Sequence, residues 1–516
     1  MLCLSDLLQQ ALRRYGEAPA LVTPNGNFTY RELDDASWRL ASFMAGHGIG
    51  AGDRIALHLR NGHEYVIADL AVLKLAAVKV PLSQIMSPSE LAYCVEHSET
   101  AVLISHASLP RLADGDAHLS LRIAVPDQAP VPEGWICWEQ ALFEGEQTFV
   151  PPRPRPEDLA MIAYTGGTTG FPKGVCHSQH RLAVNLLASI ISGDIRADEV
   201  MLLATPLPHS AGYFLQSCLV QGGKVVLVAK FEPAAFLTAA REQAVTWTFA
   251  VPTMLYRLFD ALAVGERALE DLRTIVYGAA PMSRERLEQG LVLLGPVFLQ
   301  LYGQTECPNF ITTLAKADHL QAGLLASCGR AVPMLDLRIV KADGEVAQAG
   351  EVGEVEVASP YLLLEYHKNP AATAQALEDR WLRTGDLGYL NDSRYLFLVD
   401  RAKDMIISGG MNVYSVEVEA ALRQHRAVLD AAVIGVPDLD WGESVTAFVT
   451  MLEPVDEEEL RCFAKTILSA YKVPKRFVQI GEMPLTKFGK IDKKALRCFI
   501  SLDGSVKGMA GAGAGC

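Results

Sequence analysis

Apolar positions in the first third of the chain alternate between helical spacing and short uninterrupted runs. The segment 29–49 has helical spacing and opens at Thr29 with Glu32 three residues later, which predicts a helix that begins with a capping box. Residues 64–77 predict a buried helix, and the short apolar run 54–59 predicts a strand. This alternation is typical of an α/β fold in which helices cover β-sheets.

The pattern changes in the last third of the chain. From about 325 to 400, short strands separated by turn residues predict a small β-barrel subdomain. After Arg401, two helical and two strand patterns occupy roughly a hundred residues, the size of a separate α/β domain. We therefore expect a large N-terminal domain over 1–400, a smaller domain over 404–500 and a disordered Gly/Ala-rich tail over 501–516.

Composition narrows the classes of partner. A chain of 516 residues is too long for one core, so about two to four domains are expected. The net charge of −14, without a basic block, disfavours nucleic acid or an anionic membrane surface as the main partner. Ten scattered cysteines without a C-x-x-C pair predict free thiols in a reducing cytoplasm. Since neither a signal-like start nor an apolar run of membrane-spanning length is present, we expect a cytoplasmic protein.

The stretch "YTGGTTGFPKG" (164–174) carries the first indication of chemistry. Glycines let consecutive backbone N–H groups turn toward an anion, and Lys173 adds a positive charge. The stretch differs from the nucleotide-triphosphatase P-loop because Pro172 precedes the lysine and Gly174 follows it. Its hydroxyl donors are Thr165, Thr168 and Thr169. A phosphate-binding loop is the main interpretation, and a surface hairpin turn is the alternative.

Further polar residues stand where apolar strands end, which is where α/β proteins place ligands. In "FLQLYGQTE" (298–306), Tyr302 could stack on a base, Thr305 could reach a phosphate and Glu306 could bind Mg²⁺. Tyr302 as a core residue and Glu306 as a helix N-terminal charge are the alternatives. In "IVYGAAPMS" (275–283), the small residues after the strand leave room for a flat ligand; they are Gly278, Ala279 and Ala280.

Two more segments complete the set. In "WLRTGDLGYL" (381–390), Asp386 is expected on a tight turn after a strand, where it could bind two ribose hydroxyls or be only a turn residue. In "PLTKFGKIDKKAL" (484–496), Lys490 stands in a basic loop that could equally be a solvated face. Neither segment decides a function by itself.

Together, the order and spacing of these motifs resemble the adenylate-forming superfamily of acyl- and aryl-CoA ligases, amino-acid adenylation domains and beetle luciferases. The resemblance rests on "YTGGTTGFPKG", "YGQTE", "RTGDLGYL", "DRAKDMIISGGMN" and "PLTKFGK", and it runs from about residue 5 to 497. One departure is Gly166, which stands where the family usually has Ser, so one hydroxyl contact to the phosphates is missing or replaced by backbone.

The resemblance implies a site for ATP and Mg²⁺. Thr165, Gly167, Thr168, Thr169 and Lys173 would hold the β- and γ-phosphates, and Gly278, Ala279, Ala280, Pro281 and Tyr302 would form the adenine slot. Asp386 and Arg401 would bind the ribose, Thr305 the α-phosphate, Glu306 the Mg²⁺, and Lys490 the substrate carboxylate and α-phosphate. The cations Mg²⁺ and Lys490 would offset the repulsion between the attacking carboxylate and the phosphate oxygens.

The resemblance also implies a second step, in which the thiol of coenzyme A attacks the acyl-adenylate. In the family, the C-terminal domain rotates between the two steps. Here the hinge would be residues 401–403, with Lys403 as the pivot, and Gly409 and Gly410 would line the pantetheine tunnel. Lys472, Lys475 and Arg476 could meet the phosphates of coenzyme A, and a structural role is the equal alternative.

The substrate is expected to be an aromatic or medium-length carboxylic acid. The segment 205–214 has no acidic residue that could pair with an ammonium group, which disfavours a free amino acid. His209 fits the family's gate between acyl pocket and tunnel, and a core histidine is the alternative. Expected pocket walls are Ser210, Tyr213, Phe249 and Asn309. A stand-alone enzyme that passes its acyl group to a phosphopantetheinyl carrier protein is the alternative function.

Overall fold

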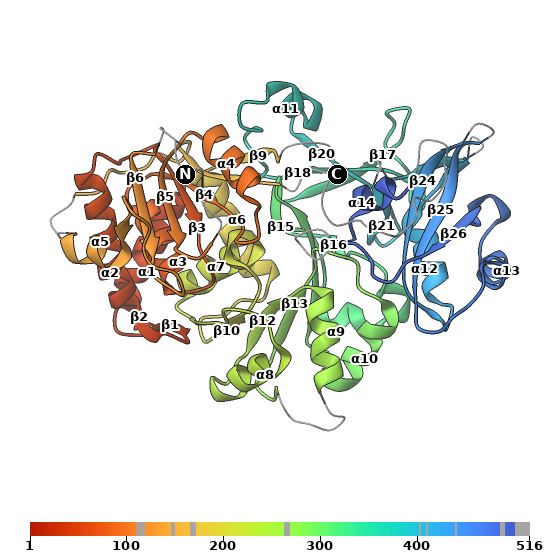
Figure 1. Ribbon diagram of the computed structural model, residues 1–516, viewed down its shortest axis with the longest axis horizontal. Coiled ribbons are helices and arrows are strands. Elements are labelled where there is room, and N and C mark those ends of the chain that lie inside the picture. Colours follow the sequence, from red (N-terminus) through yellow and green to blue (C-terminus); the bar gives the residue numbers. More distant parts are fainter. Residues whose placement is uncertain are drawn as a thin grey trace. The chain divides into compact units, whose positions relative to one another are not determined.

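A computed structural model describes residues 1–109, 112, 119–145, 150–165, 172–262, 269–401, 404–408, 411–438, 441–485 and 491–500 (Figure 1). The chain divides into two compact units. The first comprises residues 1–337 and 357–382, and the second comprises residues 338–356 and 383–516. The expected boundaries at 400 and 404 stay a prediction.

The first unit contains a seven-stranded sheet with the strand order β7-β6-β5-β3-β4-β8-β9. Neighbouring strands are parallel except β8 and β9, which form an antiparallel hairpin. The strands are β3 (Arg54–His58), β4 (Val78–Pro81), β5 (Thr100–His106), β6 (Leu121–Val125), β7 (Ile136–Cys137), β8 (Leu159–Tyr164) and β9 (Gly174–Ser178). The strand predicted at 54–59 is confirmed as β3.

Helices in the first part of this unit follow the predicted pattern. They are α1 (Leu4–Tyr15), α2 (Tyr30–Gly46), α3 (His63–Lys74), α4 (Pro88–His97), α5 (Trp138–Glu144) and α6 (Gln179–Ser192). The capping box of α2 is confirmed, because the Thr29 hydroxyl accepts from the Glu32 N–H while the Glu32 carboxylate accepts from the Thr29 N–H. The α3 helix is buried along almost its whole length, as its uniformly apolar sequence predicts.

A nine-stranded sheet forms the rest of the first unit, in the order β16-β15-β14-β13-β12-β10-β11-β1-β2. The run from β14 to β1 is parallel, and antiparallel pairs stand at both ends. The strands are β1 (Pro19–Thr23), β2 (Gly26–Thr29), β10 (Val200–Leu203), β11 (Lys224–Leu227), β12 (Trp247–Ala250), β13 (Thr274–Tyr277), β14 (Phe298–Gln304), β15 (Cys307–Leu314) and β16 (Arg330–Ala331). The accompanying helices are α7 (Gly212–Gln221), α8 (Pro233–Glu242), α9 (Pro252–Ala261), α10 (Arg284–Leu294) and α11 (Pro370–Ala376), with short helical turns at Leu207–Ala211, Lys316–Leu320 and Ala322–Leu324.

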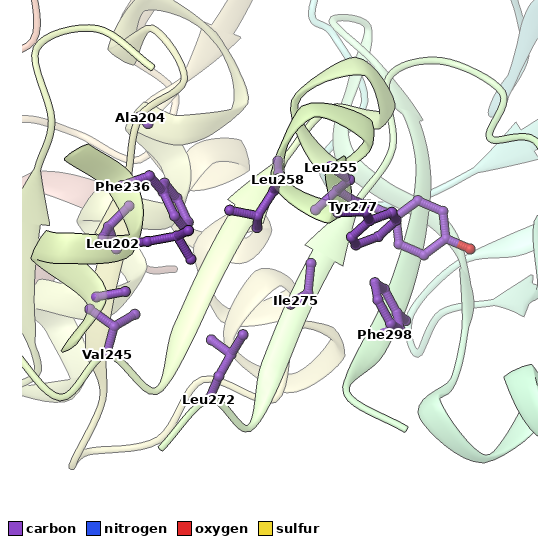
Figure 2. Close-up of a cluster of buried hydrophobic side chains, with 14 of the residues drawn as sticks. Leu202, Ala204, Phe236, Val245, Leu255, Leu258, Leu272, Ile275, Tyr277 and Phe298 are labelled. Carbon is purple, nitrogen blue, oxygen red and sulfur yellow. The ribbon is translucent and has the colours of Figure 1, made fainter. Parts of the chain in front are cut away.

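One large hydrophobic cluster joins this sheet to α8, α9 and α10. Figure 2 shows Phe236 beside Leu202, and Tyr277 beside Phe298. In the same view, Leu255 and Leu258 extend from α9 into the cluster. Phe298 is fully buried, and its ring lies 6.1 Å from that of Phe259 and 6.2 Å from that of Tyr277, both edge-on. This packing fixes the strands whose carboxyl ends carry the predicted site residues.

The second unit contains a compact C-terminal α/β domain. Its sheet has the order β23-β22-β25-β24, with β26 beside β25. The elements are β22 (Ile406–Ser408), β23 (Met411–Val413), α12 (Ser415–Arg423), β24 (Val428–Asp438), β25 (Gly442–Met451), α13 (Glu457–Ile467), a turn at Ala470–Lys472, β26 (Arg476–Gln479) and α14 (Lys493–Cys498). Both faces of the sheet carry apolar clusters.

The predicted small β subdomain corresponds to a five-stranded sheet. Its order is β17-β18-β20-β19, with β21 beside β20. The strands are β17 (Asp336–Val340), β18 (Gly353–Ala358), β19 (Leu377–Glu378), β20 (Trp381–Leu390) and β21 (Leu396–Arg401). The division between the two compact units runs through strands of this sheet. None of the helices in the described parts of the chain combines the length and the apolar character that crossing a bilayer requires.

We expect the Phe298→Ala variant to lose about 3–5 kcal/mol of unfolding free energy, because it removes a ring that is 0% exposed and leaves a cavity. The matched control is Val292→Ala on α10, where the side chain is 83% exposed and the change should stay within about 0.5 kcal/mol. Urea unfolding followed by circular dichroism measures both. Equal effects of the two substitutions would contradict the assigned core.

Candidate active site

Two predicted site segments meet at one edge of the nine-stranded sheet. β13 leads directly into Gly278–Ala280, and the parallel neighbour β14 ends at Gln304, just before Thr305 and Glu306. Since carboxyl ends of neighbouring parallel strands point the same way, the expected adenine slot and the expected phosphate and metal residues share this edge. The geometry agrees with the sequence argument that ligands bind at strand ends.

The backbone after β13 is tightly constrained. A Cβ atom at Gly278 would stand 2.4 Å from the carbonyl oxygen of Leu301, so the neighbouring strand β14 already requires glycine there. Ala279 has a φ of 66°, a left-handed conformation that L-residues adopt rarely. The small residues are therefore needed by the protein itself, in addition to any flat ligand they accommodate. Backbone of this kind is frequent at functional sites.

Glu306 lies in the turn between β14 and β15, and the alternative interpretation as a helix N-terminal charge is wrong. The hydroxyl of Tyr366 donates a hydrogen bond of 2.6 Å to Glu306 Oε1. Within the described residues, no other hydrogen bond or ion pair of this carboxylate is found. Burial, and then the negative charge of Glu306, raise the pKa of the Tyr366 phenol well above its usual value, so the phenol stays a donor.

Lys173 contacts the ring of the same tyrosine. Its ammonium group lies 4.8 Å from the centroid of the Tyr366 ring. The segment between β8 and β9 is indeed a hairpin connection, closed at its base by a hydrogen bond from the Thr165 N–H to the Lys173 carbonyl (3.0 Å). The hairpin alternative and a ligand-binding role are thus compatible, because the lysine at the base lies over the tyrosine that holds Glu306. Gly167, Thr168 and Thr169 lie outside the described residues.

A short segment, residues 361–367, connects these motifs through its backbone. The Leu363 N–H donates to the Glu306 carbonyl (2.7 Å), which ties the segment to the β14–β15 turn. Further bonds tie it to β9: Leu364 N–H to the Cys176 carbonyl (2.8 Å), Cys176 N–H to the Glu365 carbonyl (2.9 Å) and His367 N–H to the Gly174 carbonyl (2.7 Å). A Cβ at Gly174 would lie 2.8 Å from Ile162 Cγ2 and 3.2 Å from His367 Cβ, so glycine permits this close approach.

Neither Tyr366 nor residues 361–367, which we call the clamp segment, is indicated by a sequence pattern. A tyrosine in a short apolar stretch resembles an ordinary core residue, and its pairing with β9 joins positions about 190 residues apart in the chain. Periodicity contains no information about such contacts. The functional interpretation of Tyr366 requires the structure.

His177 is a second residue that the sequence analysis missed. It lies in β9, is fully buried, and its Nε2 lies 2.9 Å from the carbonyl oxygen of Thr305. Burial lowers the pKa of His177 to about 4, so the imidazole is neutral at physiological pH and its Nε2–H is the donor. The backbone of Thr305 is therefore held by β9, the strand that follows the Gly-rich loop.

The buried neutral state of His177 predicts acid sensitivity. The pKa of His177 is about 4 in the folded state and 6.5 in the unfolded state. Between pH 4 and 6.5, the unfolded state therefore binds one more proton at this histidine than the folded state does. The free energy of unfolding consequently rises with pH from about 4 to 6.5 and then levels off. We expect His177→Gln to make the slope at pH 5–6 shallower by about 1.4 kcal/mol per pH unit. Thermal and urea unfolding across pH 4–8 measure this slope.

The exposed residue Val292 provides the control, and Val292→Gln, which changes no ionisable group, should leave the slope as in the wild type. An unchanged slope in the His177 variant would contradict the assigned protonation state.

The expected acyl-pocket residues lie on elements of the first unit. His209 and Ser210 belong to the turn Leu207–Ala211, in which His209 has non-helical angles (φ −113°, ψ −152°). A kink of this type redirects side chains and is frequent at functional sites. On α7, which follows, the Tyr213 hydroxyl lies 4.0 Å from Met161 Sδ. Phe249, at the end of β12, packs against Phe214 with ring centroids 5.2 Å apart.

Asn309 is unusual among these residues. Its side chain is only 5% exposed, its φ is 60°, and neither its amide nitrogen nor its amide oxygen has a hydrogen-bond partner within the described part of the chain. A buried amide without partners is destabilising unless something else satisfies it. Asn309 therefore combines strained backbone with unsatisfied polar atoms, three residues beyond Glu306.

In the second unit, the two expected ribose ligands stand opposite each other. Asp386 in β20 pairs with Arg401 in β21 in antiparallel register. The expectation that Asp386 lies on a tight turn after a strand is wrong, because Asp386 lies within one strand, β20 (Trp381–Leu390), and pairs there with β21; the φ of 72° at Gly385 is a local irregularity inside that strand. Asp386 is 5% exposed. The adjacent Asp400 accepts hydrogen bonds from the N–H and the hydroxyl of Ser415, the first residue of α12.

Several lysines of the second unit have structural partners. Lys472 forms an ion pair with Glu417 (2.6 Å), and Lys475 lies over the Trp441 ring. These contacts favour the structural interpretation of both side chains. Lys493 pairs with Glu419 (2.7 Å), which is buried, so the basic loop is not simply a solvated face. Four of the expected site residues of this part of the chain lie outside the described residues: Lys403, Gly409, Gly410 and Lys490.

Comparison with known proteins gives the family. Residues 8–367 match the family model described as AMP-binding enzyme, and residues 417–490 match the model of its C-terminal domain. The medium/long-chain-fatty-acid–CoA ligase of Mycobacterium tuberculosis is 33% identical over 95% of this chain and 89% of its own length. A fatty acid–[acyl-carrier-protein] ligase of Streptomyces coeruleorubidus is 30% identical, covering 93% of each chain.

A solved structure supports the same assignment. The o-succinylbenzoate CoA synthetase of Bacillus subtilis, in complex with its acyl-adenylate intermediate, superposes with a TM-score of 0.85 at 29% identity, covering 95% of this chain and 97% of that one. The chain belongs to the AMP-binding enzyme family. It is an adenylate-forming, AMP-releasing acid–thiol ligase.

Proposed function

We propose that the protein activates an aromatic or medium-length carboxylic acid at the edge of the nine-stranded sheet and transfers the acyl group to coenzyme A. The observation that carries this proposal is the arrangement of Lys173, Tyr366 and Glu306. It brings the lysine of the Gly-rich loop to the ring of one tyrosine and the carboxylate of "YGQTE" to its hydroxyl. A cation for the phosphates and an anion for a metal thereby contact the same side chain.

In the first half-reaction, the substrate carboxylate attacks the α-phosphorus of ATP and pyrophosphate leaves. The carboxylate is ionised at neutral pH, so no general base is needed. Lys173 would bind the leaving phosphates, Thr305 the α-phosphate, and Lys490 the pair of reacting groups. Fixed cations placed where negative charge accumulates are the main source of rate acceleration in such a reaction.

Glu306 suits Mg²⁺, because Mg²⁺ prefers carboxylate oxygens and commonly takes its remaining ligands from substrate phosphates and water. Within the described ranges, no group of three or more His, Cys, Asp or Glu side chains with metal-binding geometry is found. We propose that Glu306 shares the ion with the phosphates of ATP. When bound, the ion would neutralise phosphate charge.

The second half-reaction requires a thiol, and we propose coenzyme A with Lys403 as the pivot and Gly409–Gly410 beside the pantetheine. A carrier protein is the second candidate acceptor, because one relative of similar length is an acyl-carrier-protein ligase. None of the nine cysteines in the described part of the chain forms a disulfide, which supports the proposed cytoplasmic location.

The acid is the least constrained component. Phe249 and Phe214 provide aromatic walls, Tyr213 and Ser210 provide hydroxyls, and the unsatisfied amide of Asn309 can both donate and accept. This mixture favours an acid with an apolar or aromatic body and a polar substituent over a purely aliphatic chain. His209, at the kink before α7, would gate the pocket.

The function is tested with a panel of aryl, hydroxyaryl and C6–C12 aliphatic acids. Pyrophosphate release is measured first, and thioester formation with coenzyme A or with a phosphopantetheinyl carrier protein second. We expect both steps with coenzyme A for at least one aryl or medium-length acid. Transfer to the carrier protein but not to coenzyme A would make the carrier protein the acceptor. If no acid in the panel gives pyrophosphate release, the proposal is overturned.

Lys490→Ala should slow adenylation by about a hundred- to a thousandfold, because its charge is needed while pyrophosphate leaves. Thioester formation from supplied acyl-adenylate should be nearly unaffected. Lys494→Ala is the control, at an exposed position in the same basic segment. Quenched-flow measurement of each half-reaction separates the two effects, and equal losses in both would refute the assigned role.

Asp386→Asn should raise the KM for ATP about tenfold or more, because the isosteric amide loses a charged hydrogen bond to ribose while it retains the volume of a buried side chain. Asp392→Asn, at an exposed position between β20 and β21, should leave the KM unchanged. Steady-state kinetics and a thermal unfolding midpoint are measured together. A wild-type KM in a folded Asp386 variant rules out ribose binding by this residue.

A further inference from the structure

Tyr366 belongs to none of the motifs that define the family resemblance, yet it contacts two of them. We propose that Tyr366 is a positioning residue for adenylation: its hydroxyl orients the Glu306 carboxylate for the metal ion, and its ring holds the Lys173 ammonium close to that carboxylate without an ion pair. This proposal rests on the proposed roles of Glu306 and Lys173.

The hydroxyl of Tyr366 determines the orientation of the Glu306 carboxylate. The hydrogen bond from Tyr366 to Oε1 (2.6 Å) fixes the rotation of the carboxylate, and therefore the direction in which Oε2 points. A charge-assisted bond of this length is strong, so the carboxylate is held in one orientation. Partners that orient a metal-binding carboxylate in this way commonly contribute a large part of the metal affinity.

The ring of Tyr366 holds the positive charge of Lys173. Lys173 and Glu306 have opposite charges, and they contact the ring and the hydroxyl of Tyr366, respectively. A direct ion pair between them would compete with phosphate for the lysine and with metal for the carboxylate. The ring face attracts the ammonium group at 4.8 Å, more weakly than an ion pair does. A lysine held in this way is kept near the site and is released readily when a phosphate arrives.

The position of Tyr366 does not depend on either contact. Its own N–H donates to the Thr373 hydroxyl (2.9 Å), it bridges Val175 of β9, and its neighbours Glu365 and His367 are hydrogen-bonded to β9 as well. The backbone therefore places the ring, and removal of the hydroxyl leaves the ring in place. Tyr366→Phe isolates the hydroxyl function, and Tyr366→Leu removes both functions.

The chain also contains a matched control. Tyr361, five residues earlier in the same clamp segment, is fully buried and donates its hydroxyl to the Phe310 carbonyl (2.7 Å). Tyr361→Phe therefore removes an equivalent buried hydroxyl from the same segment without touching Glu306 or Lys173. A general structural effect of such a substitution would appear in both variants.

The test is Mn²⁺ binding to the full-length protein with ATP present and no carboxylic acid, measured by electron paramagnetic resonance. We expect Tyr366→Phe to weaken Mn²⁺ binding about 10–100-fold, and to raise the half-saturating Mg²⁺ concentration in pyrophosphate release to a similar extent. The KM for ATP at saturating Mg²⁺ should stay at the wild-type value in Tyr366→Phe and rise in Tyr366→Leu. Tyr361→Phe should match the wild type in every measurement.

Three results would overturn the proposal. In the first, Tyr366→Phe binds Mn²⁺ as tightly as the wild type. In the second, Tyr361→Phe loses as much affinity as Tyr366→Phe, which would make the effect structural. In the third, ATP together with the wild-type protein binds Mn²⁺ no more tightly than ATP alone does, which would remove the metal role of Glu306 itself and with it this part of the proposed function. If Tyr366→Leu fails to fold, the phenylalanine variant still decides the hydroxyl function.

Discussion

The site depends on one set of backbone hydrogen bonds, those that attach residues 361–367 to β9 and to the turn after β14. Through these bonds, two sheets that are distant in sequence present their motifs to the same tyrosine. None of the bonded groups is a side chain, so the arrangement is insensitive to most substitutions along the segment. The Gly174 position is the exception, because there a side chain would collide with both sides of the junction. Chemistry performed by side chains thus relies on geometry provided by main chain.

Much of the architecture could be predicted because it is local. The α2 capping box, the buried α3 helix and the strand before the Gly-rich loop follow from residue type and spacing over fewer than twenty positions. The error at Asp386 shows the limit of this reasoning. A Gly-Asp pair is typical of a turn, and Gly385 does have a left-handed φ of 72°, but the pairing of Asp386 with Arg401 continues the strand through this pair. Tertiary context overrode local preference.

The site could be predicted only in part, for a related reason. Motif residues such as Lys173 and Glu306 are visible as unusual residue types in short stretches, whereas Tyr366 and His177 are ordinary in composition and become informative only through their partners. His177 is a histidine inside an apolar strand, and its interest lies entirely in the Thr305 carbonyl that it holds. Residues that act through position rather than through reactivity have no distinctive sequence pattern.

The strand order of the nine-stranded sheet has a consequence for synthesis of the chain. β1, among the first segments to be made, pairs with β11 some two hundred residues later, and the clamp segment that completes the site joins β9 only after residue 367 has emerged. Until then, β1 and β9 present unpaired edges and apolar faces to the cellular environment. Assembly of such non-local sheets is slow compared with helix formation, so the nascent chain passes through a long period of aggregation risk. Translation speed and chaperone access, rather than equilibrium stability, then determine how much active protein a cell obtains.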